Sequence, residues 1–148
     1  MTVQPPTNIA TRADCVTCYT DAAWRASDGA TGCGWIFQRS GNQDTRQGSS
    51  YFTNIRSPLL GEALAMRLAL SHALSLGINR VCVYSDCQLL VRAISSKSPP
   101  VEFYGITRDI ETLSLQFEPF CLFYISRTLN KSADLLEKSA LCNVSPLV

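Results

Sequence analysis

The sequence is poor in charge, and its few charged residues nearly cancel. Of 148 residues, 13 are Lys or Arg and 12 are Asp or Glu, so the net charge is +1 at pH 7. Proteins that bind nucleic-acid backbones usually carry a basic excess, so any such role here would depend on local placement of charge. Charged residues make up 17% and apolar residues 46%. This balance argues against disorder and allows one domain with a sizeable core.

Long apolar runs are also missing. The most apolar stretch, 59–78, is interrupted by Glu62, Arg67 and His72, and residues 1–14 hold no apolar segment of signal-peptide length. We therefore expect no membrane contact and an intracellular protein, cytoplasmic or nuclear, that is not secreted.

Histidine is scarce and the cysteines are scattered. Cys15 and Cys18 form one CxxC pair, but a zinc site would need a second pair or histidines at ligand spacing, and His72 is the only histidine. Seven cysteines is an odd number in a chain of this length. We expect free thiols in a reducing compartment, with His72 on the face of a helix.

Residue patterns predict an alternation of strands and helices. Residues 1–13 are expected to be a flexible arm, and 14–148 a single domain. β-branched and aromatic residues predict strands at 15–24, 33–38, 49–55, 80–85 and 120–125, and helical spacing of apolar residues predicts helices at 57–77, 88–96, 104–116 and 132–141. Strands joined by short hairpins and then by helices imply an α/β fold with a mixed sheet and helices on its faces.

Four carboxylates lie at element ends or inside apolar segments: Asp21, Glu62, Asp86 and Asp134. Each alone has a structural explanation, as a cap, a strand-edge residue or a partner of a helix dipole. If the first and fourth strands are parallel neighbours, however, Asp21 and Asp86 meet at the carboxyl end of the sheet, where a packed helix adds Glu62. Such carboxylates repel one another unless a hard cation such as Mg²⁺ binds. Two ions about 3.5–4 Å apart would suit phosphodiester hydrolysis.

Three segments, 19–37, 57–95 and 123–141, resemble plant reverse-transcriptase-like ribonuclease H domains in order and spacing. The shared features are an Asp before a Gly-rich hairpin, an E-A-x-A helix, a Y-S-D strand end and R-x-x-N-x-x-A-D-x-L. The resemblance implies the ribonuclease H-like fold, with a five-stranded mixed sheet ordered 3-2-1-4-5. It also implies two-metal catalysis with Mg²⁺, for which Mn²⁺ can substitute, and hydrolysis of the RNA strand of an RNA–DNA hybrid.

The resemblance assigns roles to individual residues. Asp21, Glu62 and Asp86 would be the main metal ligands, and Asp134 a more weakly engaged fourth carboxylate. Ser85, Arg127 and Asn130 would contact nucleic acid. For Arg127 and Asn130 a helix-entry hydrogen bond is an equally good explanation.

Two departures from the family favour a second hypothesis. Tyr124 stands where many ribonucleases H have a mobile histidine, and between Pro99 and Pro119 Arg108 is the only cation among four acidic residues. These features fit a domesticated, catalytically weak domain that binds nucleic acid or protein. A 3′–5′ exonuclease or resolvase on the same fold fits the R-x-x-N-x-x-A-D-x-L motif less well.

Overall fold

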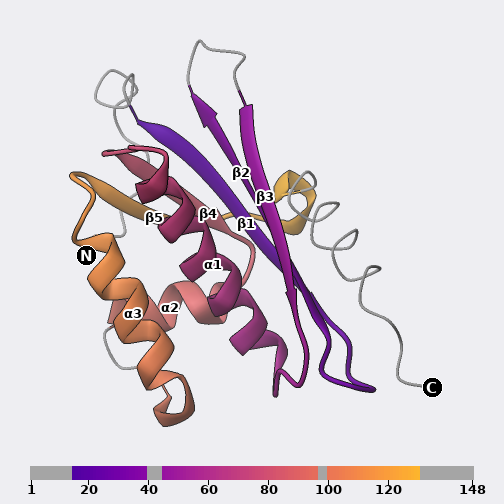
Figure 1. Ribbon diagram of the computed structural model, residues 1–148. Coiled ribbons are helices and arrows are strands. Elements are labelled where there is room, and N and C mark those ends of the chain that lie inside the picture. Colours follow the sequence, from indigo (N-terminus) through magenta and orange to yellow (C-terminus); the bar gives the residue numbers. More distant parts are fainter. Residues whose placement is uncertain (1–14, 40–44, 97–99, 131–148) are drawn as a thin grey trace.

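The computed structural model describes residues 15–39, 45–96 and 100–130. The expected arm at 1–13 and the expected terminal helix at 132–141 lie outside these residues. The strands are β1 (Val16–Trp24), β2 (Thr31–Arg39), β3 (Thr45–Phe52), β4 (Val81–Ser85) and β5 (Phe120–Tyr124). They form one sheet ordered β3-β2-β1-β4-β5 (Figure 1). β1 pairs antiparallel with β2 and parallel with β4, which confirms the predicted mixed sheet and its order.

The three described helices begin and end within two residues of the boundaries predicted from the sequence. They are α1 (Pro58–Ser75), α2 (Gln88–Ser96) and α3 (Tyr104–Ser114), with short 3₁₀ turns η2 (Val101–Phe103) and η3 (Arg127–Asn130). α1 begins where the Ser57 hydroxyl accepts a hydrogen bond from Leu60 N at 3.2 Å, with Pro58 in the first turn. After its last turn the chain turns away at Gly77, whose φ of 77° favours glycine.

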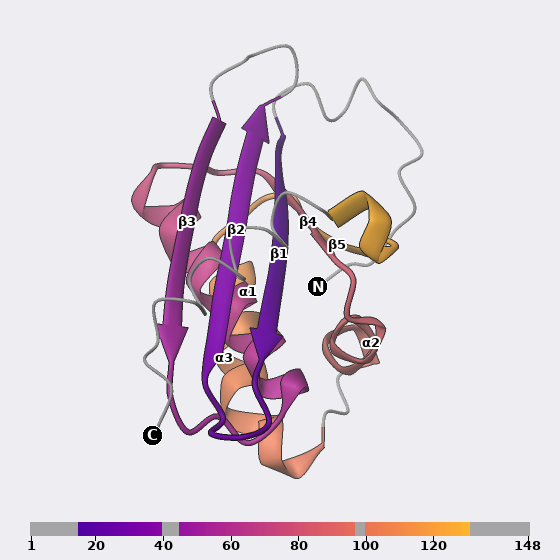
Figure 2. The same cartoon turned by 90° about the vertical axis from the view of Figure 1, so that its right-hand side faces the viewer.

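The main core lies between the sheet and the helices. α1 and α3 lie on the same side of the sheet (Figure 2), and side chains from all three helices join one buried cluster with the strands. A smaller cluster covers part of the opposite face, where the Tyr84 ring lies 5.4 Å from that of Tyr19 and 5.3 Å from that of Phe123. The sheet is therefore held from both sides along β1, β4 and β5.

The third strand lies several residues earlier than the predicted 49–55, so that boundary prediction was wrong. The register pairs Trp35 with Gly48, where any β-carbon would come within 2.5 Å of the indole ring. The strand ends before Asn54, which has a positive φ of 59°. Packing of the Trp35 ring on Gly48 thus outweighs the local preference of the β-branched and aromatic residues.

His72 has a structural role, and the cysteines in the described part of the chain are unbridged. His72 Nδ1 accepts a hydrogen bond from Trp35 Nε1 at 2.9 Å, and Trp35 is buried in the core. All six cysteines among the described residues are free thiols, as predicted. None of the described helices combines the length and the apolar character needed to span a membrane.

Candidate active site

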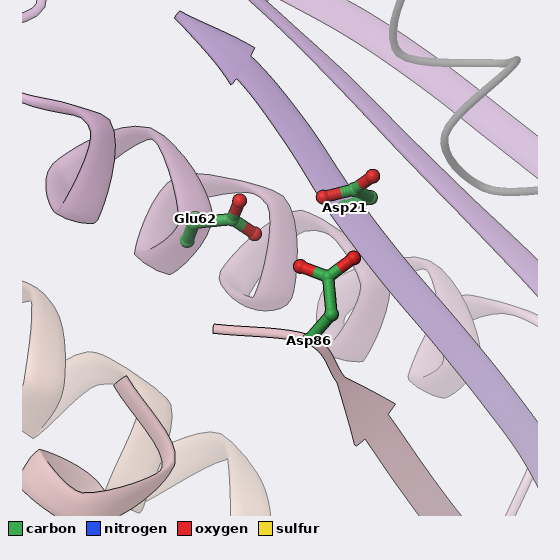
Figure 3. A group of neighbouring side chains, drawn as sticks. All are labelled: Asp21, Glu62 and Asp86. Atoms are coloured by element: carbon green, nitrogen blue, oxygen red, sulfur yellow. The ribbon is translucent and has the colours of Figure 1, made fainter. Parts of the chain in front are cut away.

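Three carboxylates from distant parts of the sequence converge at one end of the sheet. Asp21 comes from β1, Glu62 from the start of α1, and Asp86 from the residue after β4; one oxygen of each lies within 4.8 Å of the others (Figure 3). The parallel register pairs Thr20 with Ser85, so the next residue of each strand carries a carboxylate to the same edge. The predicted convergence of Asp21, Glu62 and Asp86 is therefore present in the tertiary structure.

Glycine lets α1 approach the sheet closely enough to bring Glu62 to this site. A β-carbon on Gly61 would lie 2.8 Å from Thr31 Cγ2 and 3.7 Å from Ala22 Cβ. Gly61 therefore sets the distance between α1 and the ends of β1 and β2. Gly61 could not be recognised from the sequence, because a glycine in the first turns of a helix carries no local mark of a tight contact.

The three carboxylates are buried together. Asp21 is fully buried, Glu62 is 6% exposed, and the Asp86 side chain is 1% exposed. Burial, reinforced by the charges of Asp21 and Asp86, raises the pKa of Glu62 well above 4.5. Without a counter-charge, the site therefore favours a protonated Glu62.

The donor set fits a divalent cation. Within the described chain, Glu62 Oε1 and Asp86 Oδ1 are buried and have no hydrogen-bond partner. Buried carboxylate oxygens are costly unless a donor or a cation satisfies them. Three carboxylates offer the all-oxygen ligands that Mg²⁺ and Mn²⁺ prefer, so these residues could hold such an ion. The position of Asp134, the expected fourth carboxylate, lies outside the described residues.

A buried amide links the two strands that carry the site. Asn130 Nδ2 donates to Thr20 O at 2.8 Å and to Asp86 Oδ2 at 3.2 Å, and Asn130 is 1% exposed. It therefore joins the backbone just before Asp21 to the side chain of Asp86. The sequence suggested a helix-entry hydrogen bond or a nucleic-acid contact for Asn130, and no local pattern indicated this bridge across 44 and 110 residues.

Ser85 lies inside the protein as well. It is fully buried, and its hydroxyl accepts a hydrogen bond from Cys87 N at 3.1 Å. This bond shapes the turn that carries Asp86. Contacts of Ser85 and Asn130 with nucleic acid stay predictions, and in this conformation both side chains face the protein.

Arg127 brings positive charge to the edge of the site. Its guanidinium lies 3.9 Å from Asp86 Oδ1, and its side chain is 70% exposed. It lines a groove of about 650 Å³ that includes Glu62 and Asp86, and apolar wall residues include Leu89 and Phe103. Arg127 is the only cation among the described residues that line this groove. Glu102 also lines the groove, so its described lining carries three carboxylates and one guanidinium group.

Comparisons with known proteins identify the family of this chain. Residues 19–140 match the family described as reverse transcriptase-like, and the chain belongs to that family. No curated protein sequence matches it.

Solved structures show the ribonuclease H fold. RNase H1 of the halophilic archaeon Halobacterium salinarum superposes with a TM-score of 0.81 at 21% identity, covering 87% of this chain and 98% of the other. The N-terminal RNase H domain of a Mycobacterium tuberculosis protein superposes with a TM-score of 0.78 at 20% identity, covering 86% of this chain and 93% of the other. An RNase H1 isolated from compost by a metagenomic approach was solved in complex with an RNA/DNA hybrid. It superposes with a TM-score of 0.76 at 21% identity, covering 86% of this chain and 96% of the other.

Proposed function

We propose that this protein is a Mg²⁺-dependent ribonuclease H-type endonuclease that hydrolyses the RNA strand of RNA–DNA hybrids. The observation that carries the proposal is the cluster of Asp21, Glu62 and Asp86, buried within 4.8 Å of one another at the end of a ribonuclease H-like sheet. Similar folds include one solved with an RNA/DNA hybrid, which supports the substrate class.

In this proposal the three carboxylates hold the metal, and Asp134 is the expected fourth ligand. Bound Mg²⁺ or Mn²⁺ would supply a reactive water and offset the charge that develops on the phosphate. Asn130 keeps Asp86 oriented through its hydrogen bond, so that side chain need not be reorganised when the substrate arrives. The products would be a 5′-phosphate and a 3′-hydroxyl.

Arg127 and the groove would position the nucleic acid. An exposed guanidinium at the rim can pair with a phosphate, because it offers several donors in a planar fork. The apolar wall formed by Leu89 and Phe103 would contact sugars and exclude water beside the carboxylates. Preference for a hybrid would come from the 2′-hydroxyls of one strand and the backbone of the other.

The test compares cleavage of a labelled RNA–DNA hybrid, double-stranded RNA and single-stranded DNA over a titration of Mg²⁺. We expect cleavage of the RNA strand of the hybrid, and a loss of about a hundredfold or more in D86N, because the substitution removes a metal ligand. D109N is the matched control, since the Asp109 side chain is 57% exposed. Unchanged hybrid cleavage by purified D86N would refute the assignment.

A domesticated, catalytically weak binding domain is the second candidate. Tyr124 is 49% exposed and stands where many ribonucleases H have a mobile histidine. The segment 100–119 carries four acids and one cation, Arg108, so few phosphates can be neutralised there. Binding of hybrid without cleavage in Mg²⁺ or Mn²⁺ would favour this candidate over the nuclease.

A further inference from the structure

Helix α3 exposes a second row of large side chains besides the row that it buries. The buried row packs against α1 and includes Ile106 and Ile110; Figure 1 shows the two helices side by side. The second row includes Val101, Tyr104 and Leu115, whose exposed fractions are 89%, 54% and 77%. The exposed row therefore belongs to the side of α3 that α1 leaves uncovered.

The exposed row has the spacing of a coiled-coil seam. Its members are Val101, Tyr104, Arg108, Glu111 and Leu115, at intervals that alternate between three and four residues. This alternation keeps side chains in line along a helix and defines the a and d positions of a heptad. Val101 lies in the 3₁₀ turn η2, where residues three apart are eclipsed, so it stays in line with Tyr104. Single exposed apolar residues are ordinary, but a row with this period is typical of a helix that packs against another helix.

Two opposite charges occupy the middle of this row. Arg108 is exposed and Glu111 is partly exposed, and neither forms an ion pair with another of the described residues. The Arg108 guanidinium lies 5.7 Å from the centre of the Tyr104 ring, so it stays within the row. Asp109 is different, because its carboxylate binds Arg67 of α1 at 2.8 Å. Along this row α3 therefore offers a partner one cation and one anion, a single turn apart.

The order of the charges fits a second copy of this chain that runs antiparallel to the first. With a twofold axis between residues 109 and 110, Arg108 of each copy lies opposite Glu111 of the other, and Tyr104 lies opposite Leu115. Parallel pairing in register would place like charges opposite one another, which disfavours that arrangement. A contact that uses the same patch on both copies closes on itself, so assembly stops at a dimer.

We propose that this exposed row of α3 is the interface of an antiparallel dimer of the protein. The stretch shared by the two helices, 104–115, is about 17 Å long at 1.5 Å per residue. An interface built from one such helix pair is below the usual size of stable complexes, so the dimer is weak. Gly105 beside the row has open space around its β-carbon position, which leaves room for the second helix. The pairing does not depend on the proposed nuclease activity, because α3 carries none of the three carboxylates of the candidate active site.

The experiment measures the association of the full chain as its concentration rises. Sedimentation velocity from about 10 μM to about 1 mM should show a monomer–dimer equilibrium with a Kd of about 100 μM. In ¹H–¹⁵N NMR over the same range, the amides of Arg108, Glu111 and Leu115 should shift with concentration. Those of Asp86 and Cys87, at the candidate active site, should stay in place.

A charge swap tests the antiparallel register directly. R108E and E111R each place like charges opposite one another and should weaken dimerisation about tenfold or more. The double variant R108E/E111R restores opposite charges and should regain an affinity close to that of the wild type. Thermal unfolding confirms that all three variants are folded. A merely structural effect of either substitution would add in the double variant and would not be rescued.

Leu115 tests the apolar part of the row. L115Q should weaken dimerisation about tenfold, because it removes the side chain that meets Tyr104 of the second copy. L129Q is the matched control, since Leu129 is 71% exposed on η3, outside the row, and this variant should leave the Kd unchanged.

Three outcomes would overturn the proposal. They are a chain that stays monomeric at the highest concentration, a double charge variant that dimerises no more tightly than the single ones, and equal losses of affinity in L115Q and L129Q. A row that serves another protein or a nucleic acid would give the first of these. Hybrid cleavage is measured at enzyme concentrations far below the expected Kd, where the chain is a monomer. Failure of the dimer and failure of the nuclease assignment are therefore distinguishable.

Discussion

Asn130 Nδ2 lies 3.2 Å from Asp86 Oδ2 and 2.8 Å from Thr20 O, so one buried amide holds two strands of the candidate active site in register. Loss of this amide frees the Asp86 side chain and leaves Thr20 O without the donor. We expect N130A to lower hybrid cleavage about 10- to 100-fold and to weaken Mg²⁺ binding, as is usual for residues that orient metal ligands.

The control for Asn130 separates positioning from folding. N130A should also lose about 1–3 kcal/mol of stability, because a buried acceptor is left unsatisfied. N130L has nearly the same size and loses the donor facing Asp86 without adding a charge beside the metal ligands. If N130L retained full Mg²⁺ affinity by calorimetry, the positioning role of Asn130 would be wrong.

Glu62 should destabilise the metal-free protein at neutral pH. Its folded-state pKa is raised above 4.5, first by burial and then by Asp21 and Asp86. The stability that the protonated form contributes is fully present below the unfolded value and is lost as the pH rises through the folded value. E62Q should therefore melt a few degrees higher than the wild type at pH 8 in chelator, and the difference should shrink toward pH 5.

Added Mg²⁺ should make the wild type melt at a higher temperature than E62Q. The ion stabilises the wild type by binding its ionised carboxylates, and it should stabilise E62Q much less. E118Q, at an exposed position, is the control and should follow the wild type throughout. A lower melting temperature for metal-free E62Q than for the wild type at pH 8 would contradict the prediction.

Gly61 should tolerate alanine poorly, although alanine favours helices. The new β-carbon would lie 2.8 Å from Thr31 Cγ2, and Thr31 is fully buried. We expect G61A to lose about 1–3 kcal/mol by overpacking and to lower kcat, since the displaced helix carries Glu62. Urea unfolding and hybrid cleavage measure the two effects.

Gly105 offers the matched substitution in α3. A β-carbon there meets no atom within 4 Å. G105A should therefore gain about 0.5–1 kcal/mol from helix propensity and leave cleavage unchanged. Equal effects of the two substitutions would show that the contact between Gly61 and Thr31 does not constrain α1.

Arg127 should act on substrate binding more than on stability. Its side chain is 70% exposed and its guanidinium lies 3.9 Å from the buried Asp86 Oδ1, at the outer limit of an ion pair, so the contact contributes little to folding. We expect R127A to leave the melting temperature unchanged, to raise KM for the hybrid about tenfold and to lower the salt dependence of binding by about one phosphate contact. R127K should have a KM between those of the wild type and R127A, because lysine keeps the charge without the planar fork of the guanidinium group. A KM equal to that of the control R108A would exclude the contact.

Periodicity and turn residues predicted most of the fold because they act locally. The Ser57-Pro58 start of α1 and the break at Gly77 depend on residues close in the chain. The third strand was misplaced because its register depends on Gly48 fitting under Trp35, a contact between two strands. No local pattern contains that information.

The sequence by itself determined the order of strands and helices, and it marked Asp21, Glu62 and Asp86 as carboxylates in costly positions. Only the tertiary structure decided that their oxygens meet within 4.8 Å and that Asn130 joins the backbone of Thr20 to the side chain of Asp86. These features depend on strand register and on the close approach of α1, and both are set by packing between segments far apart in the chain.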